Sequence, residues 1–556
     1  MTVIRVLLLL GAVLTSFSSN AFTPHDLWQV WPQARFETTA APCLRHSLLM
    51  QRMQVLESWY PDKIRLKEVG KSFLGRPIKM LTLGKGDKKI LLWSQMHGNE
   101  PSATPALLDI ANFLLEQADD PVARSILEQY TLLMIPMLNP DGAEIYKRRN
   151  AQGIDINRDA LQLVTPEGRI LKRIRDQYEP MLGFNLHDQD RRKSVGNTGQ
   201  VATNAVLAVS GDAANTLTPG RQRTKRASAA IVEALAPFIP GGMARYDEDW
   251  NPRAFGDNIT AWGTPVVLIE SGGLPPGRDF SELTRLNFVA ILTVLAGLAH
   301  DDLAGYDPQV YEDLPRNETD AWSDVVVRGA YIRQPGSSVP FRADLAFDVL
   351  RNDRQFADCS EDPIIPSRIF LIGDASFHGA GTSIDASSNL LLTPFEIGVR
   401  GWSKRDWFED DGLARFARLG VGVIYWAVGE SHNAEAKALA RRLNRQGLPR
   451  IKVLSKPASF PELVLSEPPP KIAPVSLQGV MHVLGVENPD SADALDQMWM
   501  KTAEDKAGMP RLHKKLPASF LLVSPASDGN IDIKTARLNA VWLDGEQAMS
   551  KPAPEK

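Results

Sequence analysis

The stretch KILLWSQMHGNE at residues 89–100 decides the fold of the first half of this chain. Its first five residues form a short apolar run, which is typical of a buried β-strand. His97 and Glu100 follow directly after that run. Residues 101–117 come next and carry apolar side chains at helical spacing along one face. A strand, a polar loop and an amphipathic helix in this order predict one unit of an α/β sheet.

The same kind of unit recurs further along the chain. Apolar runs predict buried strands, and periodic stretches predict helices between them. The strands are expected at 130–138 (YTLLMIPML), 181–186 (MLGFNL) and 265–269 (PVVLI), and the helices at 167–178 and 228–236. Strands that are apolar along their whole length are covered on both faces. The first half therefore predicts an α/β sheet with helices on both of its faces.

Polar side chains stand at the carboxyl ends of these strands. His187 and Asp188 follow the run at 181–186, and Glu270 follows the run at 265–269. Ligands in open α/β sheets bind beyond the carboxyl ends of the strands, so we expect these side chains to meet. Two histidines and one carboxylate satisfy the three-ligand count of a catalytic zinc site, whose fourth position is left to water.

Each of these residues taken singly also has a structural interpretation. Glu100 would complement the helix dipole of 101–117, His187 would be a satisfied core histidine, and Glu270 would be a solvated strand end. Their joint position at matching strand ends favours the metal site.

Together the motifs resemble the zinc carboxypeptidase family over about residues 25–305. The matching segments, in the family's order, are 70–78, 97–100 (HGNE), 139–142 (NPDG), 148–158, 186–187 and 269–273 (IESGG). The resemblance implies a carboxypeptidase-like mixed β-sheet flanked by helices on both faces. It also implies one zinc ion per chain and hydrolysis of a peptide bond next to a free carboxylate.

The resemblance assigns a role to each motif residue. It implies His97, Glu100 and His187 as zinc ligands, Glu270 as general base and Arg148 as the group that polarises the scissile carbonyl. It further implies that Asn157 and Arg158 hold the terminal carboxylate of the substrate, while Asp155 orients a zinc-binding histidine.

Some positions depart from the family pattern. Asp188 and Gln189 follow the third ligand where digestive members carry small or aromatic residues, which leaves the adjacent subsite open. Tyr246 is a loose counterpart of the family's mobile tyrosine. The stretch 249–259, where side-chain preference should be set, aligns too poorly to name a pocket.

The second half has a fainter resemblance, to amidohydrolases. It is carried by 324–329 (DVVVRG), 342–346 (RADLA), 384–386 (IDA), 393–397 (TPFEI) and 540–545 (AVWLDG). Arg400 and Trp402 stand where that family has its His-x-His metal pair, and neither side chain offers a lone pair to a metal. We therefore expect a smaller β-rich α/β accessory domain without zinc.

These observations divide the chain into five segments. Residues 1–21 read as a signal peptide, because one arginine precedes an apolar stretch shorter than the roughly 20 residues of a membrane span. The catalytic domain is expected at 22–305, a linker at 306–322, the accessory domain at 323–550 and a tail at 551–556. The protein is then expected in the periplasm, with no membrane span after signal cleavage.

Composition limits the remaining possibilities. A net charge of −4 without a basic run gives no support for nucleic-acid binding. The two cysteines, Cys43 and Cys359, rule out a disulfide framework; they could pair in an oxidising compartment, but the sequence favours two free thiols. The expected partner is a peptide or cell-wall peptide substrate. Two other functions stay open: a deacylase of N-acyl amino acids, related to aspartoacylase and succinylglutamate desuccinylase, and a non-catalytic periplasmic zinc-binding protein.

Overall fold

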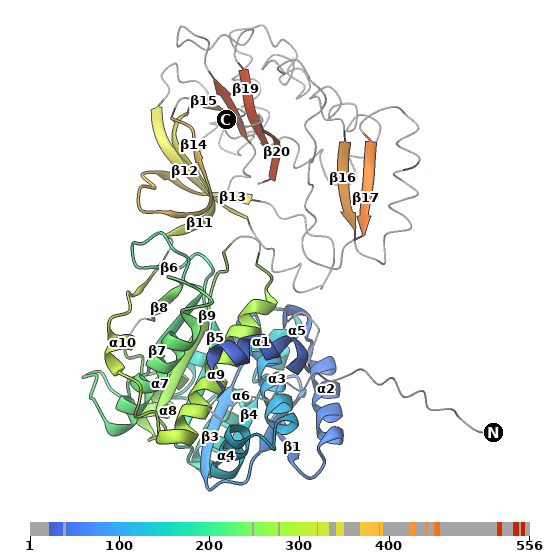
Figure 1. Cartoon of the computed structure of the whole chain (residues 1–556), viewed down its shortest axis with the longest axis vertical. Coiled ribbons are helices and arrows are strands. Elements are labelled where there is room, and N and C mark those ends of the chain that lie inside the picture. Colours follow the sequence, from blue (N-terminus) through green and yellow to red (C-terminus); the bar gives the residue numbers. More distant parts are fainter. Residues whose placement is uncertain are drawn as a thin grey trace, which may run out of the picture.

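The computed structural model describes two regions of the chain (Figure 1). The described residues are 22–36, 41–246, 249–275, 278–319, 321–332, 341–349, 367–387, 390–392, 423–428, 441, 450–455, 520–524, 537–543 and 546–550. We call residues 22–319 the α/β region and residues 321–550 the β-rich region. The signal peptide predicted at 1–21 and the tail at 551–556 lie outside the described residues.

An eight-stranded mixed sheet forms the frame of the α/β region, with the strand order β1-β2-β4-β3-β5-β9-β7-β8. Strands β4, β3, β5 and β9 are parallel neighbours, whereas β1, β2 and β7 pair in the antiparallel sense with β2, β4 and β9. The bounds are β1 (Ile64–Lys71), β2 (Pro77–Leu83), β3 (Lys88–Trp93), β4 (Tyr130–Ile135), β5 (Leu182–Asp188), β7 (Asn204–Ala208), β8 (Met243–Arg245) and β9 (Val266–Ser271). The expected mixed sheet is confirmed, and its parallel strands end at one shared edge.

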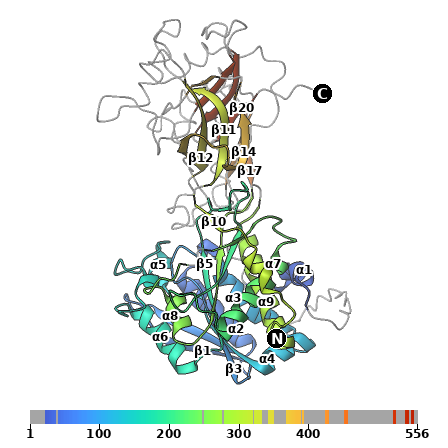
Figure 2. The ribbon, with the colours of Figure 1, turned by 90° about the vertical axis from the view of Figure 1, so that its left-hand side faces the viewer.

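Helices cover both faces of this sheet, as Figure 2 shows from the side. Alternate residues of β3 enter two separate cores, with Ile90 and Leu92 in one and Leu91 and Trp93 in the other. This explains why the strand is apolar along its whole length. The first face carries α1 (Pro24–Ala34), α3 (Ala103–Glu116), α4 (Pro121–Gln129), α7 (Pro219–Leu235) and α9 (Ser281–Asp301), and the second carries α6 (Pro166–Tyr178) and α8 (Phe255–Ala261). Helix α2 (His46–Trp59) packs near β1.

Helix α9 is long and apolar enough to cross a membrane by its length and composition. Within the fold, 78% of its apolar window is buried, and it packs against α3 and α7. A core helix of a water-soluble fold meets the same criteria as a membrane span, and α9 occupies such a core position.

Of the linker expected at 306–322, residues 306–319 are folded against the rest of the α/β region. They contain α10 (Pro308–Glu312) and the short strand β10 (Asn317–Glu318), which pairs with β6 (Ser194–Val195). Tyr311 of α10 is completely buried in the main core, and its hydroxyl accepts a hydrogen bond from the backbone N–H of Ala208. The α/β region therefore extends through β10.

The β-rich region contains a second mixed sheet. Its strand order is β13-β12-β11-β15-β18-β19-β20, with β14 paired to β11, and β16 and β17 form a separate parallel pair. The bounds are β11 (Trp322–Ile332), β12 (Phe341–Val349), β13 (Ser367–Gly373), β14 (Gly379–Asp385), β15 (Leu390–Leu392), β16 (Val423–Val428), β17 (Arg450–Ser455), β18 (Phe520–Ser524), β19 (Arg537–Leu543) and β20 (Glu546–Ser550). Arg400 and Trp402, on which the expected loss of a metal pair rests, lie outside the described residues.

Cys43 corrects one expectation. The sequence favours free thiols, but Cys43 is disulfide-bonded in the structure. The one other cysteine in the sequence is Cys359, which lies outside the described residues. The expectation of a free thiol at Cys43 was therefore wrong. It could not be avoided from the sequence, because two cysteines more than 300 positions apart carry no local signal that they pair.

Tyr311→Ala is expected to lower the free energy of unfolding by about 3–5 kcal/mol, the usual cost of removing a buried aromatic ring. The loss includes the hydrogen bond from Ala208. Denaturant unfolding of the full chain measures it, with Gln309→Ala, at an exposed position of the same helix, as the control. Equal stability of the two variants would mean that α10 does not belong to the core.

Candidate metal centre

Three parallel strands bring the candidate ligands to one edge of the first sheet. His97 and Glu100 lie in the loop between β3 and α3, and His187 lies near the end of β5. Glu270 stands near the end of β9, where it pairs directly in register with His187. The expected meeting of these strand ends is what the structure shows.

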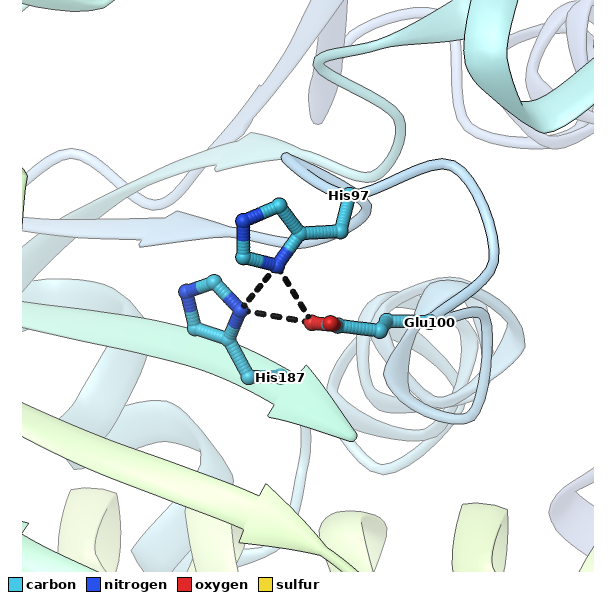
Figure 3. A group of neighbouring side chains, drawn as sticks. All are labelled: His97, Glu100 and His187. Atoms are coloured by element: carbon cyan, nitrogen blue, oxygen red, sulfur yellow. Dashed lines mark hydrogen bonds and ion pairs between the residues drawn. The ribbon is translucent and has the colours of Figure 1, made fainter. Parts of the chain in front are cut away.

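The side chains of His97, Glu100 and His187 converge on a common point (Figure 3). The Nδ1 atoms of the two imidazoles are 3.1 Å apart. Oε2 of Glu100 lies 2.8 Å from Nδ1 of His97 and 2.7 Å from Nδ1 of His187. Among the described residues this is the one cluster of three His, Cys, Asp or Glu donors that could hold a metal ion.

The chemistry of this cluster fits zinc. Two imidazole nitrogens and one carboxylate oxygen form a common ligand set for catalytic zinc, and all three residues are buried. Burial opposes the ionisation of Glu100, yet the adjacent imidazoles of His97 and His187 hold its pKa far below the usual range. Burial lowers the pKa of His187. For His97 burial also lowers the pKa, but Glu100 and Asp155 outweigh it and raise the pKa overall. A metal ion binds only deprotonated imidazoles, so its binding would release the proton of His97.

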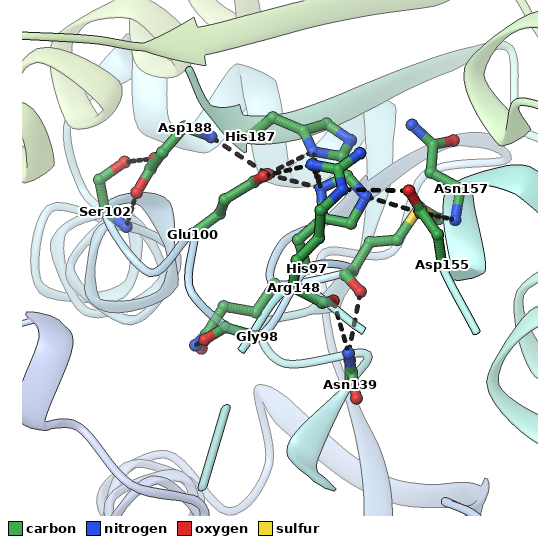
Figure 4. Close-up of polar contacts among 12 residues, drawn as sticks. His97, Gly98, Glu100, Ser102, Asn139, Arg148, Asp155, Asn157, His187 and Asp188 are labelled. Atoms are coloured by element: carbon green, nitrogen blue, oxygen red, sulfur yellow. Dashed lines mark hydrogen bonds and ion pairs between the residues drawn. The ribbon is translucent and has the colours of Figure 1, made fainter. Parts of the chain in front are cut away.

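Arg148 and Asp155 support the ligands from one side (Figure 4). Asp155 Oδ1 lies 3.1 Å from Nε2 of His97, and this contact holds the ring with Nδ1 toward Glu100 and His187. Asp155 Oδ2 accepts a hydrogen bond of 3.0 Å from Nε of Arg148. Arg148 Nη1 also donates to Glu100 Oε1 at 2.9 Å, so its guanidinium faces the ligand atoms.

The NPDG motif builds the base of the site. Asn139 caps α5 (Pro140–Glu144) by accepting from the backbone N–H of Gly142, and its amide nitrogen donates to the carbonyls of Met96 and Arg148. One side chain thus ties the loop of the first ligand to Arg148. Gly98 is required here, because a Cβ on it would lie 2.0 Å from the carbonyl carbon of Gly142.

The two residues expected to hold a terminal carboxylate lie just beyond Asp155. Asn157 Oδ1 accepts a hydrogen bond from the backbone N–H of Phe255, which fixes its amide against α8. The side chain of Arg158 is exposed. Glu270 chiefly raises the pKa of Tyr246 and burial that of Asp257, and the positive charge of Arg158 offsets part of both shifts.

Glu270 lies in a strongly acidic environment. Burial raises its pKa well above the usual range, and the nearby Glu100 and Asp188 raise it further. Burial also raises the pKa of Asp188 to about 7, against hydrogen bonds from the hydroxyl and N–H of Ser102. Several carboxylates in one buried space favour a bound cation, because a cation lowers the cost of ionising them.

Tyr246 lies within the same electrostatic environment. The charge of Glu270 is the largest cause of its raised pKa, and burial is the next. The resemblance offers only a loose match at this position, because Tyr246 follows the short strand β8 at a distance from every strong motif. Ser102, which fixes Asp188, was not among the expected site residues; it stands two positions after Glu100, at the start of α3.

Comparison with known proteins supports the resemblance in one part of the chain. Residues 49–205 match the sequence profile of the zinc carboxypeptidase family. Carboxypeptidase SOL1 of Arabidopsis thaliana is 35% identical over 102 residues, which are 17% of this chain and 21% of that protein. Gamma-D-glutamyl-L-diamino acid endopeptidase 1 of Lysinibacillus sphaericus is 30% identical over 106 residues, 18% of this chain and 26% of that protein. The resemblance is thereby confirmed over 49–205.

The match to these relatives is partial in length. The chain spans 21% and 26% of the two relatives' own sequences. A metallo-carboxypeptidase from Burkholderia cenocepacia, known as a crystal structure, aligns with a TM-score of 0.37 and 20% identity over 44% of this chain and 68% of that chain.

His187→Ala is expected to lower zinc content well below one ion per chain, because a three-ligand site has no spare donor. Metal analysis of the purified, zinc-equilibrated variant measures this. His300→Ala, which removes an exposed histidine outside the site, is the control and should leave zinc content unchanged. Full zinc occupancy in His187→Ala would mean that this residue is not a ligand.

Proposed function

We propose that this protein is a zinc metallocarboxypeptidase, which hydrolyses the peptide bond next to a free carboxylate. One observation carries the proposal. The donor atoms of His97, Glu100 and His187 lie within 4.8 Å of one another, beside the buried Glu270, and three of these four residues fall in the segment that matches zinc carboxypeptidases.

His97, Glu100 and His187 would hold the metal. A zinc ion in such a site polarises a carbonyl and makes water acidic enough to react near neutral pH. Asp155 holds the His97 ring by its Nε2, so that Nδ1 stays directed toward Glu100 and His187. The chain thus supplies both the donors and the contact that orients one of them.

Glu270 is the proposed general base. It stands on the strand next to His187, and a buried carboxylate with a raised pKa accepts a proton from water more readily than an exposed one. The same carboxyl group would then donate that proton to the departing amine. This exchange needs no other acid in the site.

Arg148, Asn157 and Arg158 are proposed to bind the substrate. A guanidinium stabilises the negative charge that develops on a carbonyl oxygen, and Arg148 is the cation next to the ligand cluster. Arg158 is exposed and has a planar fork that fits a carboxylate. Asn157, held by Phe255, presents its amide beside it.

The substrate class is a peptide or a cell-wall peptide. The relative from Lysinibacillus sphaericus carries a name that refers to a gamma-D-glutamyl-diamino acid bond, so cell-wall peptides belong in the substrate set. Export to the periplasm is part of the proposal. The amino-terminal sequence supports it, and so does the disulfide at Cys43, because disulfides persist mainly outside the reducing cytoplasm.

A pair of peptides tests the proposed activity. The zinc-loaded protein is expected to release the last residue of a peptide with a free terminal carboxylate and to leave its amidated twin almost uncut, because the amide offers Arg158 no charge. Mass spectrometry of the products measures this, with a chelator-treated sample as the control. Muropeptides and N-acyl amino acids complete the panel. Faster hydrolysis of N-acyl amino acids than of every peptide would make the protein a deacylase.

Glu270→Gln is expected to keep zinc bound and to lower kcat by about 10²–10⁴-fold, the usual contribution of general acid–base catalysis. Gln has nearly the same shape but cannot accept the proton. Zinc content and kcat are measured on the same preparation. Loss of the metal would instead make Glu270 a ligand, and unchanged kcat would remove it from the reaction.

A further inference from the structure

Lys193 lies on the loop that follows β5, the strand that carries His187, and it stands directly before β6. This loop crosses the carboxyl end of β9. A Cβ on Gly273 would lie 2.3 Å from the carbonyl oxygen of Arg191, so the loop packs closely over the residues that follow Glu270. The loop therefore forms one rim of the proposed catalytic centre.

Contacts with residues 317–324 fix this rim. Strand β6 pairs with β10, so that Ser194 faces Glu318 and Val195 faces Asn317. Asn317 donates a 2.7 Å hydrogen bond to Oε1 of Gln189. On the other side of the loop, the backbone N–H of Ala202 donates to the carbonyl of Lys193. The backbone of Lys193 is thus held from both directions.

The three consecutive cations of this loop differ in their partners. Arg191 forms a bidentate ion pair with Asp324, at 2.8 and 2.7 Å. Arg192 is paired with Asp190 at 2.7 Å. Lys193 has no carboxylate within ion-pair distance among the described residues, and its ammonium group donates to the Thr319 hydroxyl at 3.3 Å.

The ammonium group of Lys193 lies near Tyr246, whose ring packs against the small cluster that contains Ala205, the residue paired with Glu270 between β7 and β9. Its Nζ lies 5.7 Å from the ring centroid of Tyr246, and the charge of Glu270 is the largest influence on that tyrosine. Lys193 also acts on Glu270, whose pKa it lowers in part. Tyr246 follows β8, whereas Arg148 contacts His97 after β3. Because β8 and β3 lie on opposite sides of β9 in the sheet, Lys193 and Arg148 flank Glu270 from opposite sides.

We propose that Lys193 is a specificity residue, which favours substrates with a negatively charged group on the residue that contributes the scissile carbonyl. This inference rests on the proposed function. In that reaction Asn157 and Arg158 take the terminal carboxylate; Asn157 is bonded to Asp155, which contacts Arg148, so the leaving residue lies on the Arg148 side of Glu270. The acyl part of the substrate must then extend past the other side, where Lys193 contacts the Thr319 hydroxyl and has no carboxylate within ion-pair distance in the part of the chain that the structure describes. An acidic side chain or a free α-carboxylate on that residue would complete the pair.

Two matched peptides test this inference. They have the same free C-terminal residue and differ only in Glu or Gln at the position before it. The zinc-loaded full chain is expected to cleave the Glu peptide with a kcat/KM about fivefold higher, the scale of one solvent-accessible ion pair. Lys193→Ala should bring this ratio to about 1, and Lys193→Glu should reverse it. Arg192→Ala, which removes the neighbouring paired cation, should leave the ratio unchanged.

The ratio is an internal control, because a general loss of folding lowers both rates together. It should also fall toward 1 in about 1 M salt, where charges are screened beyond roughly 3 Å. A ratio near 1 in the unaltered protein, or one that survives Lys193→Ala, would overturn the inference and leave the proposed function intact. Both peptides carry a C-terminal residue that the protein releases in the panel above; if it cleaves no peptide or muropeptide of that panel, the proposed function is overturned, and this inference with it.

Discussion

The structure around the site depends on one electrostatic constraint: several carboxylates lie close together, away from bulk water, at the ends of β3, β5 and β9. Glu100 and Glu270 are buried and Asp188 is half-buried; Glu100 raises the pKa of both other carboxyl groups, and Asp188 raises that of Glu270. Buried like charges are unfavourable unless positive charge is nearby. Two imidazoles and the Arg148 guanidinium supply part of that charge. A divalent ion bound by His97, Glu100 and His187 would supply the remaining positive charge. The hydrogen bonds around these side chains would then hold them in place as ligands of the ion.

Much of this arrangement could be predicted from the sequence. Strand β3 was expected at 89–93 and occupies Lys88–Trp93, and the strand expected at 265–269 is β9, Val266–Ser271. Both are fully buried parallel strands, which leave a continuous apolar run in the sequence. The ligand positions followed, because parallel strands must end at one edge. The close approach of Gly98 to Gly142 leaves no room for a Cβ at position 98.

Other features had no local signal. Strand β8 has three residues, too few for a periodic pattern, so the place of Tyr246 could not be fixed. Helix α7 was expected at 228–236 but begins at Pro219, because its first turns carry arginines and a lysine in place of an apolar face. The contacts of Lys193 depend on β10, more than 120 residues further along the chain. The pairing of two segments so far apart depends on the complete fold, and no motif in either segment predicts it.

The pairing of β6 with β10 also has a consequence for the order in which the protein is made. A nascent chain that has emerged as far as Ser271 already contains every proposed zinc ligand and the proposed base. It still lacks Asn317 and Asp324, which fix the loop from Gln189 to Ala202 over Glu270. Domains fold as units while synthesis proceeds from the amino terminus. The rim of the site is therefore completed late, only after synthesis has passed through the whole α/β region and into the first strand of the β-rich region.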